Sequence, residues 1–84
     1  MDTEVKEKLK SYLERYGKVC KLHGEELIRK QTYESMSDFC FYMLDREGYI
    51  KNTDSYMQSI NNIKLIEEES EKFKKRIEDF IDSL

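Results

Sequence analysis

The chain has 84 residues, of which 39% are charged and 38% hydrophobic, and its net charge is −3. So short a chain forms one small domain, residues 1–84, and buries only about 60–65% of its unfolded surface, which leaves little room for an enclosed active site. Its 12% aromatic content argues against disorder, and the absence of proline with only three glycines argues against an all-β fold. The acidic balance disfavours non-specific binding of nucleic acid.

The N-terminal third predicts a helix over residues 3–30. Apolar residues recur on one face from Val5 to Tyr16, and Asp2 or Thr3 would cap the start. The apolar face stays in phase beyond Gly17 and Gly24, so we expect a continuous helix. A break into two helices at Gly17 is the alternative, because glycine costs about 1 kcal/mol in a helix interior.

A second, short helix is predicted over residues 35–47, after a connector at 31–34. Met36, Phe39, Cys40, Met43 and Leu44 have helical spacing, and Phe41 and Tyr42 add apolar bulk on the other side. A helix that is apolar nearly all round is usually buried on more than one side. We therefore expect it to be sandwiched between the long helices or to cover a subunit contact.

The third predicted helix covers residues 53–84. Gly48 suits the C′ position that ends the preceding helix, and Asn52, Thr53 or Asp54 suits the next N-cap. From Ile63 to Leu84 the seam residues alternate by three and four, which is the pattern of a coiled-coil seam or an antiparallel bundle. The fold prediction is all-α, either a helical bundle or an elongated helical hairpin with a long C-terminal helix.

No motif for catalysis, a metal or a cofactor stands out in the chain. Cys20 and His23 have metal-ligand spacing, but the chain has two isolated cysteines and one histidine, whereas zinc sites pair such ligands. Small core residues are the simpler interpretation, since free cysteine is often buried. We therefore expect a protein that is not an enzyme and has no cofactor.

The sequence predicts a protein–protein interaction module, a small regulator, adaptor or inhibitor, that acts through an apolar helix face and self-associates. Its partner-binding residues are predicted on the last helix, where the seam could extend beyond the intrachain partners. In a parallel dimer, Glu69 and Lys74 would form an attractive pair across the seam, although antiparallel association is left open. The predicted set is Ile66, Phe73, Ile77, Phe80, Leu84, Glu69 and Lys74.

The alternative function is DNA binding by a helix-turn-helix over residues 35–64. Gly48 would lie in the turn, and the following helix would present polar side chains that can address bases and phosphates. Those residues are Gln58, Asn61, Asn62 and Lys64. The longest apolar run has six residues and the N-terminus is charged, so we expect no membrane segment, no signal peptide and a cytoplasmic location.

Overall fold

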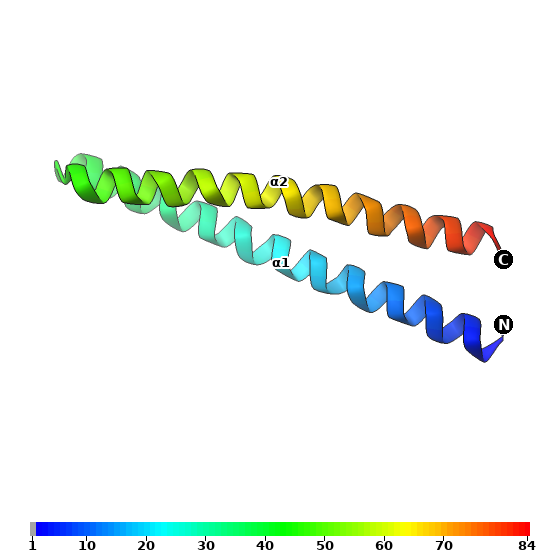
Figure 1. The fold of residues 1–84 in the computed structure, drawn as a ribbon. Coiled ribbons are helices and arrows are strands. Elements are labelled where there is room, and N and C mark those ends of the chain that lie inside the picture. Colours follow the sequence, from blue (N-terminus) through cyan, green and yellow to red (C-terminus); the bar gives the residue numbers. More distant parts are fainter. Residues whose placement is uncertain (1) are drawn as a thin grey trace.

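The computed structural model describes residues 2–84, which form two long antiparallel α-helices (Figure 1). Helix α1 spans Thr3–Tyr42 and α2 spans Arg46–Asp82, so both chain ends lie at the same end of a hairpin. The hairpin measures 63 × 16 × 12 Å, and its radius of gyration is 18.8 Å. A globular chain of this length would have about 12 Å. The predicted all-α class and the elongated form are confirmed.

The prediction of three helices is wrong, because the expected connector at 31–34 is part of α1. None of its residues breaks a helix, and their hydrogen bonds continue the ladder of the preceding turns. The apolar pattern fades there for another reason. The helix face toward α2 becomes polar, with Tyr33 half-buried and Ser37 only 8% exposed. The predicted continuity of the helix through Gly17 and Gly24 is confirmed.

The turn lies at Met43–Asp45, earlier than the predicted turn around Gly48. Leu44 occupies the left-handed position that ends α1, with φ of 60°. The Leu44 N–H donates to the Phe41 carbonyl at 3.2 Å, and the Asp45 N–H donates to the Cys40 carbonyl at 2.8 Å. These are the two hydrogen bonds of a Schellman motif. We expected glycine at this position, and leucine fills it instead.

Gly48 belongs to the first turn of α2, where close packing rather than a positive φ explains it. Its N–H donates to Asp45 Oδ1 at 3.0 Å, so Asp45 is the N-cap. A Cβ at Gly48 would meet the Asp45 carboxylate and would lie 2.8 Å from Cys40 Sγ. The predicted N-caps Asn52, Thr53 and Asp54 lie inside α2, where Asn52 Nδ2 donates to the Gly48 carbonyl at 2.8 Å.

A single heptad seam joins the two helices along their whole length. In both helices a set of less exposed residues steps by four and three, which is the a/d pattern of a coiled coil. In α1 they are Val5, Leu9, Tyr12, Tyr16, Val19, His23, Glu26, Lys30, Tyr33, Ser37 and Cys40. In α2 they are Asn52, Tyr56, Ser59, Ile63, Ile66, Ser70, Phe73, Ile77 and Phe80.

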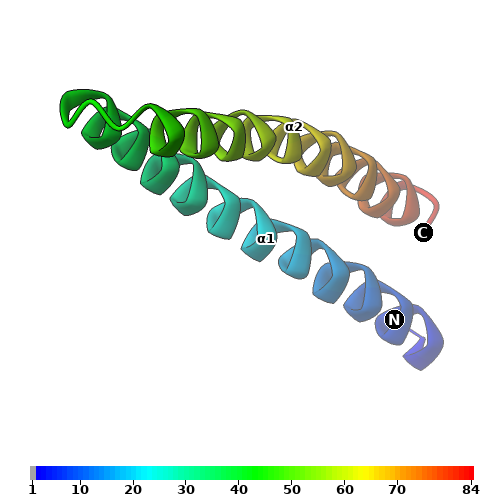
Figure 2. The ribbon, with the colours of Figure 1, turned by 60° about the vertical axis from the view of Figure 1, so that its left-hand side comes forward.

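The seam differs between its two ends. Near the turn small polar groups meet, as where Ser37 Oγ and Thr53 Oγ1 lie 2.6 Å apart. Near the termini large rings meet, and the centroids of Tyr12 and Phe80 are 5.6 Å apart in an edge-to-face arrangement. The helices accordingly diverge toward the termini (Figures 1 and 2). Small residues let backbones approach, whereas aromatic side chains hold them apart.

Two helices alone do not enclose a core. Among residues 2–84 no hydrophobic residue is buried, and the buried residues are Glu26, Ser37 and Ser59. The chain exposes 6889 Å². A compact monomer of 10.2 kDa would expose about 5,300 Å², so the hairpin exposes about 1,600 Å² more.

Candidate protein-binding surface

One flank of the seam carries a row of exposed apolar side chains, which we call the apolar flank. It consists of the residues that follow each d position of the heptad. In an antiparallel pair these e positions of the two helices lie on the same side. On α1 the row contains Leu13, Cys20 and Leu27, and on α2 it contains Ile60 and Ile81. The four aliphatic residues are between 37% and 51% exposed.

The contacts at the middle of the hairpin support this arrangement. A shallow hollow is lined by Cys20 and His23 of α1 together with Glu67, Ser70 and Glu71 of α2. His23 Nε2 lies 3.0 Å from Glu67 Oε1. Cys20 and Glu67 are both e positions, and they border the same hollow. The apolar flank is therefore one surface built from both helices.

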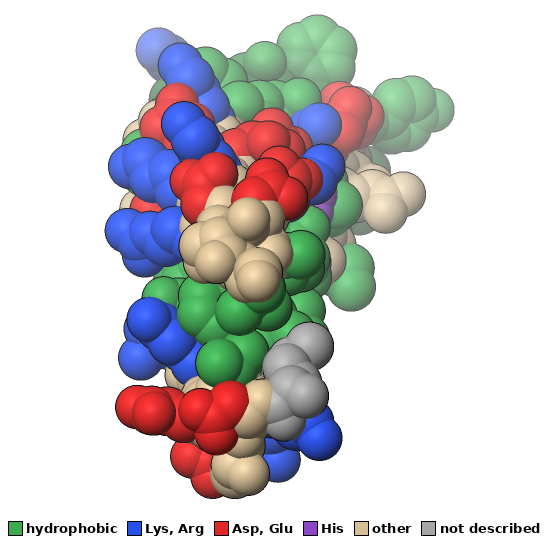
Figure 3. All heavy atoms as spheres, turned by 90° about the vertical axis from the view of Figure 1, so that its right-hand side faces the viewer, with side chains coloured by type: hydrophobic (Ala, Val, Ile, Leu, Met, Phe, Trp, Pro, Cys, Tyr) green, Lys and Arg blue, Asp and Glu red, His purple; other side chains and the backbone are tan. Residues whose placement is uncertain are grey.

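Seen from the end with the termini, hydrophobic side chains fill the space between the helices, and Lys and Arg gather along the left side (Figure 3). The flank opposite the apolar one consists of the g positions of the heptad. It carries the basic residues Lys8, Arg15, Arg29 and Arg76, together with the exposed Leu22 and Met36. The two flanks thus differ in character, and the apolar one is the better surface for another protein.

Four of the residues predicted to bind a partner lie in the seam. Ile66, Phe73, Ile77 and Phe80 face α1 and keep intermediate exposure. Besides its contact with Tyr12, the Phe80 ring has Lys8 Nζ 5.3 Å from its centroid. These residues thus have intrachain partners that the sequence did not reveal, and their role toward another molecule stays a prediction.

The other three predicted partner residues lie outside the seam contacts. Leu84 is 61% exposed at the open end of the hairpin. Glu69 and Lys74 are exposed and belong to opposite flanks, at g and e positions. Glu69 Oε2 lies 3.9 Å from Lys72 Nζ on the same helix. Their predicted pairing across a parallel seam stays a prediction, while the seam itself is occupied by α1.

The residues predicted to contact DNA lie on α2 outside the seam, and their role stays a prediction. Gln58 and Asn62 border a polar hollow on the basic flank, whereas Asn61 and Lys64 are exposed at f and b positions. The helix-turn-helix geometry expected for residues 35–64 is wrong. Gly48 lies inside α2, and the two helices run antiparallel along the hairpin instead of forming a recognition helix across a support helix.

Glu26 is a polar residue of the seam. It is 8% exposed, and its Oε1 accepts a hydrogen bond from Arg29 Nη1 at 2.8 Å. Its Oε2 is buried and has no hydrogen-bond partner. Ser55, Ser59 and other polar residues line the hollow beside it. No group of three His, Cys, Asp or Glu residues that could hold a metal ion occurs within residues 2–84.

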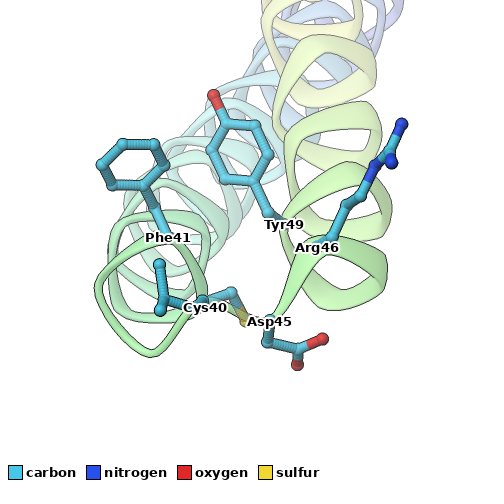
Figure 4. Close-up of a pocket in the computed structure, with 6 residues that line it drawn as sticks. Cys40, Phe41, Asp45, Arg46 and Tyr49 are labelled. Carbon is cyan, nitrogen blue, oxygen red and sulfur yellow. The ribbon is translucent and has the colours of Figure 1, made fainter.

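The apolar run Phe39–Leu44 lies at the tip of the hairpin, so the predicted sandwich between two long helices is wrong. Phe41 and Leu44 are 70% and 91% exposed. Figure 4 shows Phe41 and Tyr49 side by side at this tip, with ring centroids 5.7 Å apart. The alternative prediction, that this run covers a subunit contact, remains untested.

Comparisons with protein-family models, with curated proteins and with solved structures found no match to this chain. Neither helix, over the described residues, combines the length and apolar character that a membrane crossing requires.

Proposed function

We propose that this chain is a non-enzymatic protein–protein interaction module that works by associating with a second copy of itself through an apolar helix face. The observation that carries the proposal is the lack of any buried hydrophobic residue between residues 2 and 84. Hydrophobic burial is the dominant favourable term in folding and in most protein association. A two-helix layer obtains little of it alone, and a second layer would supply the rest.

The exposed area supports an interface of ordinary size. The hairpin exposes about 1,600 Å² more than a compact monomer of its mass. A standard interface removes about 1,600 Å² from both partners together. The excess on a single chain therefore already equals the total that a standard interface covers. The residual exposure includes the apolar flank along the hairpin and the tip around Phe41.

The predicted partner residues fit this proposal in a modified role. Ile66, Phe73, Ile77 and Phe80 contribute one side of the seam, and α1 covers them only in part. In a four-helix assembly, a second hairpin would cover their remaining surface. Leu84 would add to that contact at the open end. The seam would then be the shared core of the assembly, rather than an interface for a partner helix alone.

We place the module in the cytoplasm, where free thiols are maintained. Cys20 and Cys40 are both free. They lie twenty residues apart on one helix, a distance of about 30 Å, so they cannot bond to each other. The assembly would act as a regulator, adaptor or inhibitor by binding another molecule on its surface.

The test is the molar mass in solution, measured by size-exclusion chromatography with light scattering across low to high micromolar concentration. We expect twice the chain mass of 10.2 kDa at the upper end. A constant 10.2 kDa over the whole range would contradict self-association. DNA binding, the alternative, is tested at about 50 mM salt, where a phosphate-dependent interaction is strong. Absence of binding there would remove it.

A further inference from the structure

We infer that two hairpins pack head to tail on their apolar flanks, around a twofold axis that passes Cys20 and the level of Ser70 and Glu71. The inference rests on the proposed self-association and names its surface and direction. It commits to a second copy of this chain as the occupant of the flank. The argument comes from two rows of residues, one on each helix.

The row on α1 is symmetric about Cys20. Its members follow one another every seven residues, at e positions: Lys6, Leu13, Cys20, Leu27 and Glu34, with Phe41 beyond them at the tip. When a second α1 runs antiparallel around Cys20, Leu13 meets Leu27 of the partner subunit. Lys6 then meets Glu34 of the partner subunit, and Cys20 meets its own copy. Apolar residues face apolar residues, and a cation faces an anion at each end.

The row on α2 has the same symmetry. Its members at e positions are Ile60, Glu67, Lys74 and Ile81, with Thr53 before them near the tip. An antiparallel second α2 centred between Glu67 and Lys74 pairs Ile60 with Ile81 of the partner subunit. It pairs Glu67 with Lys74 of the partner subunit, and the twofold repeats both pairs. An antiparallel copy of the α2 row therefore places an apolar residue opposite each isoleucine and an opposite charge beside each charged residue.

The two rows share one axis, and this is an independent observation. The axis of the α2 row lies at the level of Ser70 and Glu71. The structure places Cys20 beside these two residues, since all three line one hollow with Glu67. The 3.0 Å contact between His23 and Glu67 sets the same register. A single twofold therefore satisfies both rows at once.

Gly17 and Gly24 allow the two α1 helices to come close. They lie between the members of the α1 row, so that residues 13, 17, 20, 24 and 27 step by four and three, as in a second heptad seam. A Cβ at either glycine would meet nothing within 4 Å. The chain itself leaves this space empty. A head-to-tail partner brings Gly17 against Gly24 of the partner subunit, where two backbones can approach.

Other arrangements of two hairpins are less favourable. A parallel pair of α1 helices, like a parallel pair of α2 helices, sets each charged residue against its own copy, and like charges at close range repel. A twofold along the hairpin axis sets the α2 row, with Glu67 and Lys74 at its centre, against the uncharged centre of the α1 row, so these two residues lose water without an opposite charge from the partner subunit. In the head-to-tail pair, Glu71 is the charged residue that approaches its own copy, at the outer edge of the flank.

The direct test is oxidation of the natural chain with diamide, which accepts two electrons and two protons as two thiols form one disulfide. Cys20 lies on the axis, so we expect a disulfide-linked dimer on a non-reducing gel. Cys40→Ser should retain it, because the two Cys40 residues would lie about 60 Å apart. Cys20→Ser should lose it. Cross-linking that depends on Cys40 instead would overturn the inference.

Direction is tested in the Cys20→Ser, Cys40→Ser background. One chain carries Leu13→Cys and another carries Leu27→Cys. We expect a disulfide between the two chains when they are mixed, and little when either is oxidised alone. A parallel dimer would give the reverse result. In the same background without added cysteines, light scattering checks that the dimer still forms.

The end pairs are tested by charge reversal. Lys6→Glu and Glu34→Lys should each weaken the dimer about tenfold in Kd, since each twofold assembly contains the pair twice. The double variant should restore the affinity. Glu14→Lys with Lys21→Glu, on the outer face, is the matched control and should leave Kd unchanged. No recovery in the double variant would contradict the pairing.

These experiments separate the two proposals. A monomer at all concentrations would remove self-association and the head-to-tail dimer together. A dimer that fails to cross-link at Cys20 and at the mixed Leu13 and Leu27 positions would keep the proposed function and overturn only its geometry.

Discussion

Leu44 ends α1 in a backbone conformation that leucine rarely adopts. Its φ of 60° places it in the left-handed region, and its side chain is 91% exposed. The left-handed conformation costs an L-residue about 1–2 kcal/mol, and glycine avoids that cost. The exposed leucine contributes no intrachain packing that would offset it. A leucine at this position is therefore a local source of strain at the tip.

We expect Leu44→Gly to raise the free energy of unfolding by about 1 kcal/mol, the relieved strain less the extra entropy that glycine loses. The urea midpoint at fixed protein concentration measures the change. Met43→Gly is the matched control, because Met43 has φ of −84° and no such strain to relieve. A loss of stability in Leu44→Gly would mean that the leucine side chain is held by a contact, such as a partner at the tip.

At the scale of the helix, the seam face of α1 changes from apolar to polar along its length. Toward the termini its seam residues are apolar or aromatic, from Val5 to Val19. Beyond His23 they become polar, and Glu26 is one of the buried residues. A buried carboxylate oxygen without a partner lowers stability, and polar seam residues can instead fix the register of paired helices.

Replacing the Glu26 carboxylate tests this balance. We expect Glu26→Leu to raise the free energy of unfolding by about 1 kcal/mol, since it removes a buried, unpartnered oxygen and adds apolar burial. Arg29, its partner, is exposed enough to be solvated. Glu25→Leu, at an exposed neighbouring position, should give no comparable gain. Denaturant unfolding of the two variants measures both changes in the free energy of unfolding. Destabilisation by Glu26→Leu would show that the carboxylate is bound by another polar group.

At the scale of the whole molecule, the long and thin shape of the hairpin determines how little of each side chain can be buried. The hairpin extends 63 Å but only 16 and 12 Å in the other directions, so every side chain lies near the surface. The stability of a single hairpin should then depend on whatever covers its flanks. Folding and association become one process when the monomer has no core.

We expect the thermal midpoint to rise with protein concentration, because a dimer that unfolds to single chains is favoured by mass action. Circular dichroism at 222 nm, recorded over a hundredfold range of concentration, measures the effect. The Cys40→Ser chain cross-linked through Cys20 is the control, since a linked dimer should have a midpoint that no longer varies. A constant midpoint in the free chain would point to a hairpin that is stable alone.

The sequence by itself determined the all-helical class and the continuity of α1 through Gly17 and Gly24. Both depend on local hydrogen bonds and on spacing along one helix, which are visible without the partner helix. The same spacing marked Ile66, Phe73, Ile77 and Phe80 as a seam.

The tertiary structure alone decided where the chain turns and what the seam faces. The sequence pattern predicted a turn at Gly48, because glycine often ends a helix. The turn forms at Leu44 instead, since Asp45 caps α2 and Gly48 packs closely against Cys40 inside α2. The stretch at residues 31–34 looked like a loop, but none of its residues breaks the helix, and Tyr33 lies against polar residues of α2. The apolar flank exists only through pairing, since its two rows come from helices far apart in the sequence.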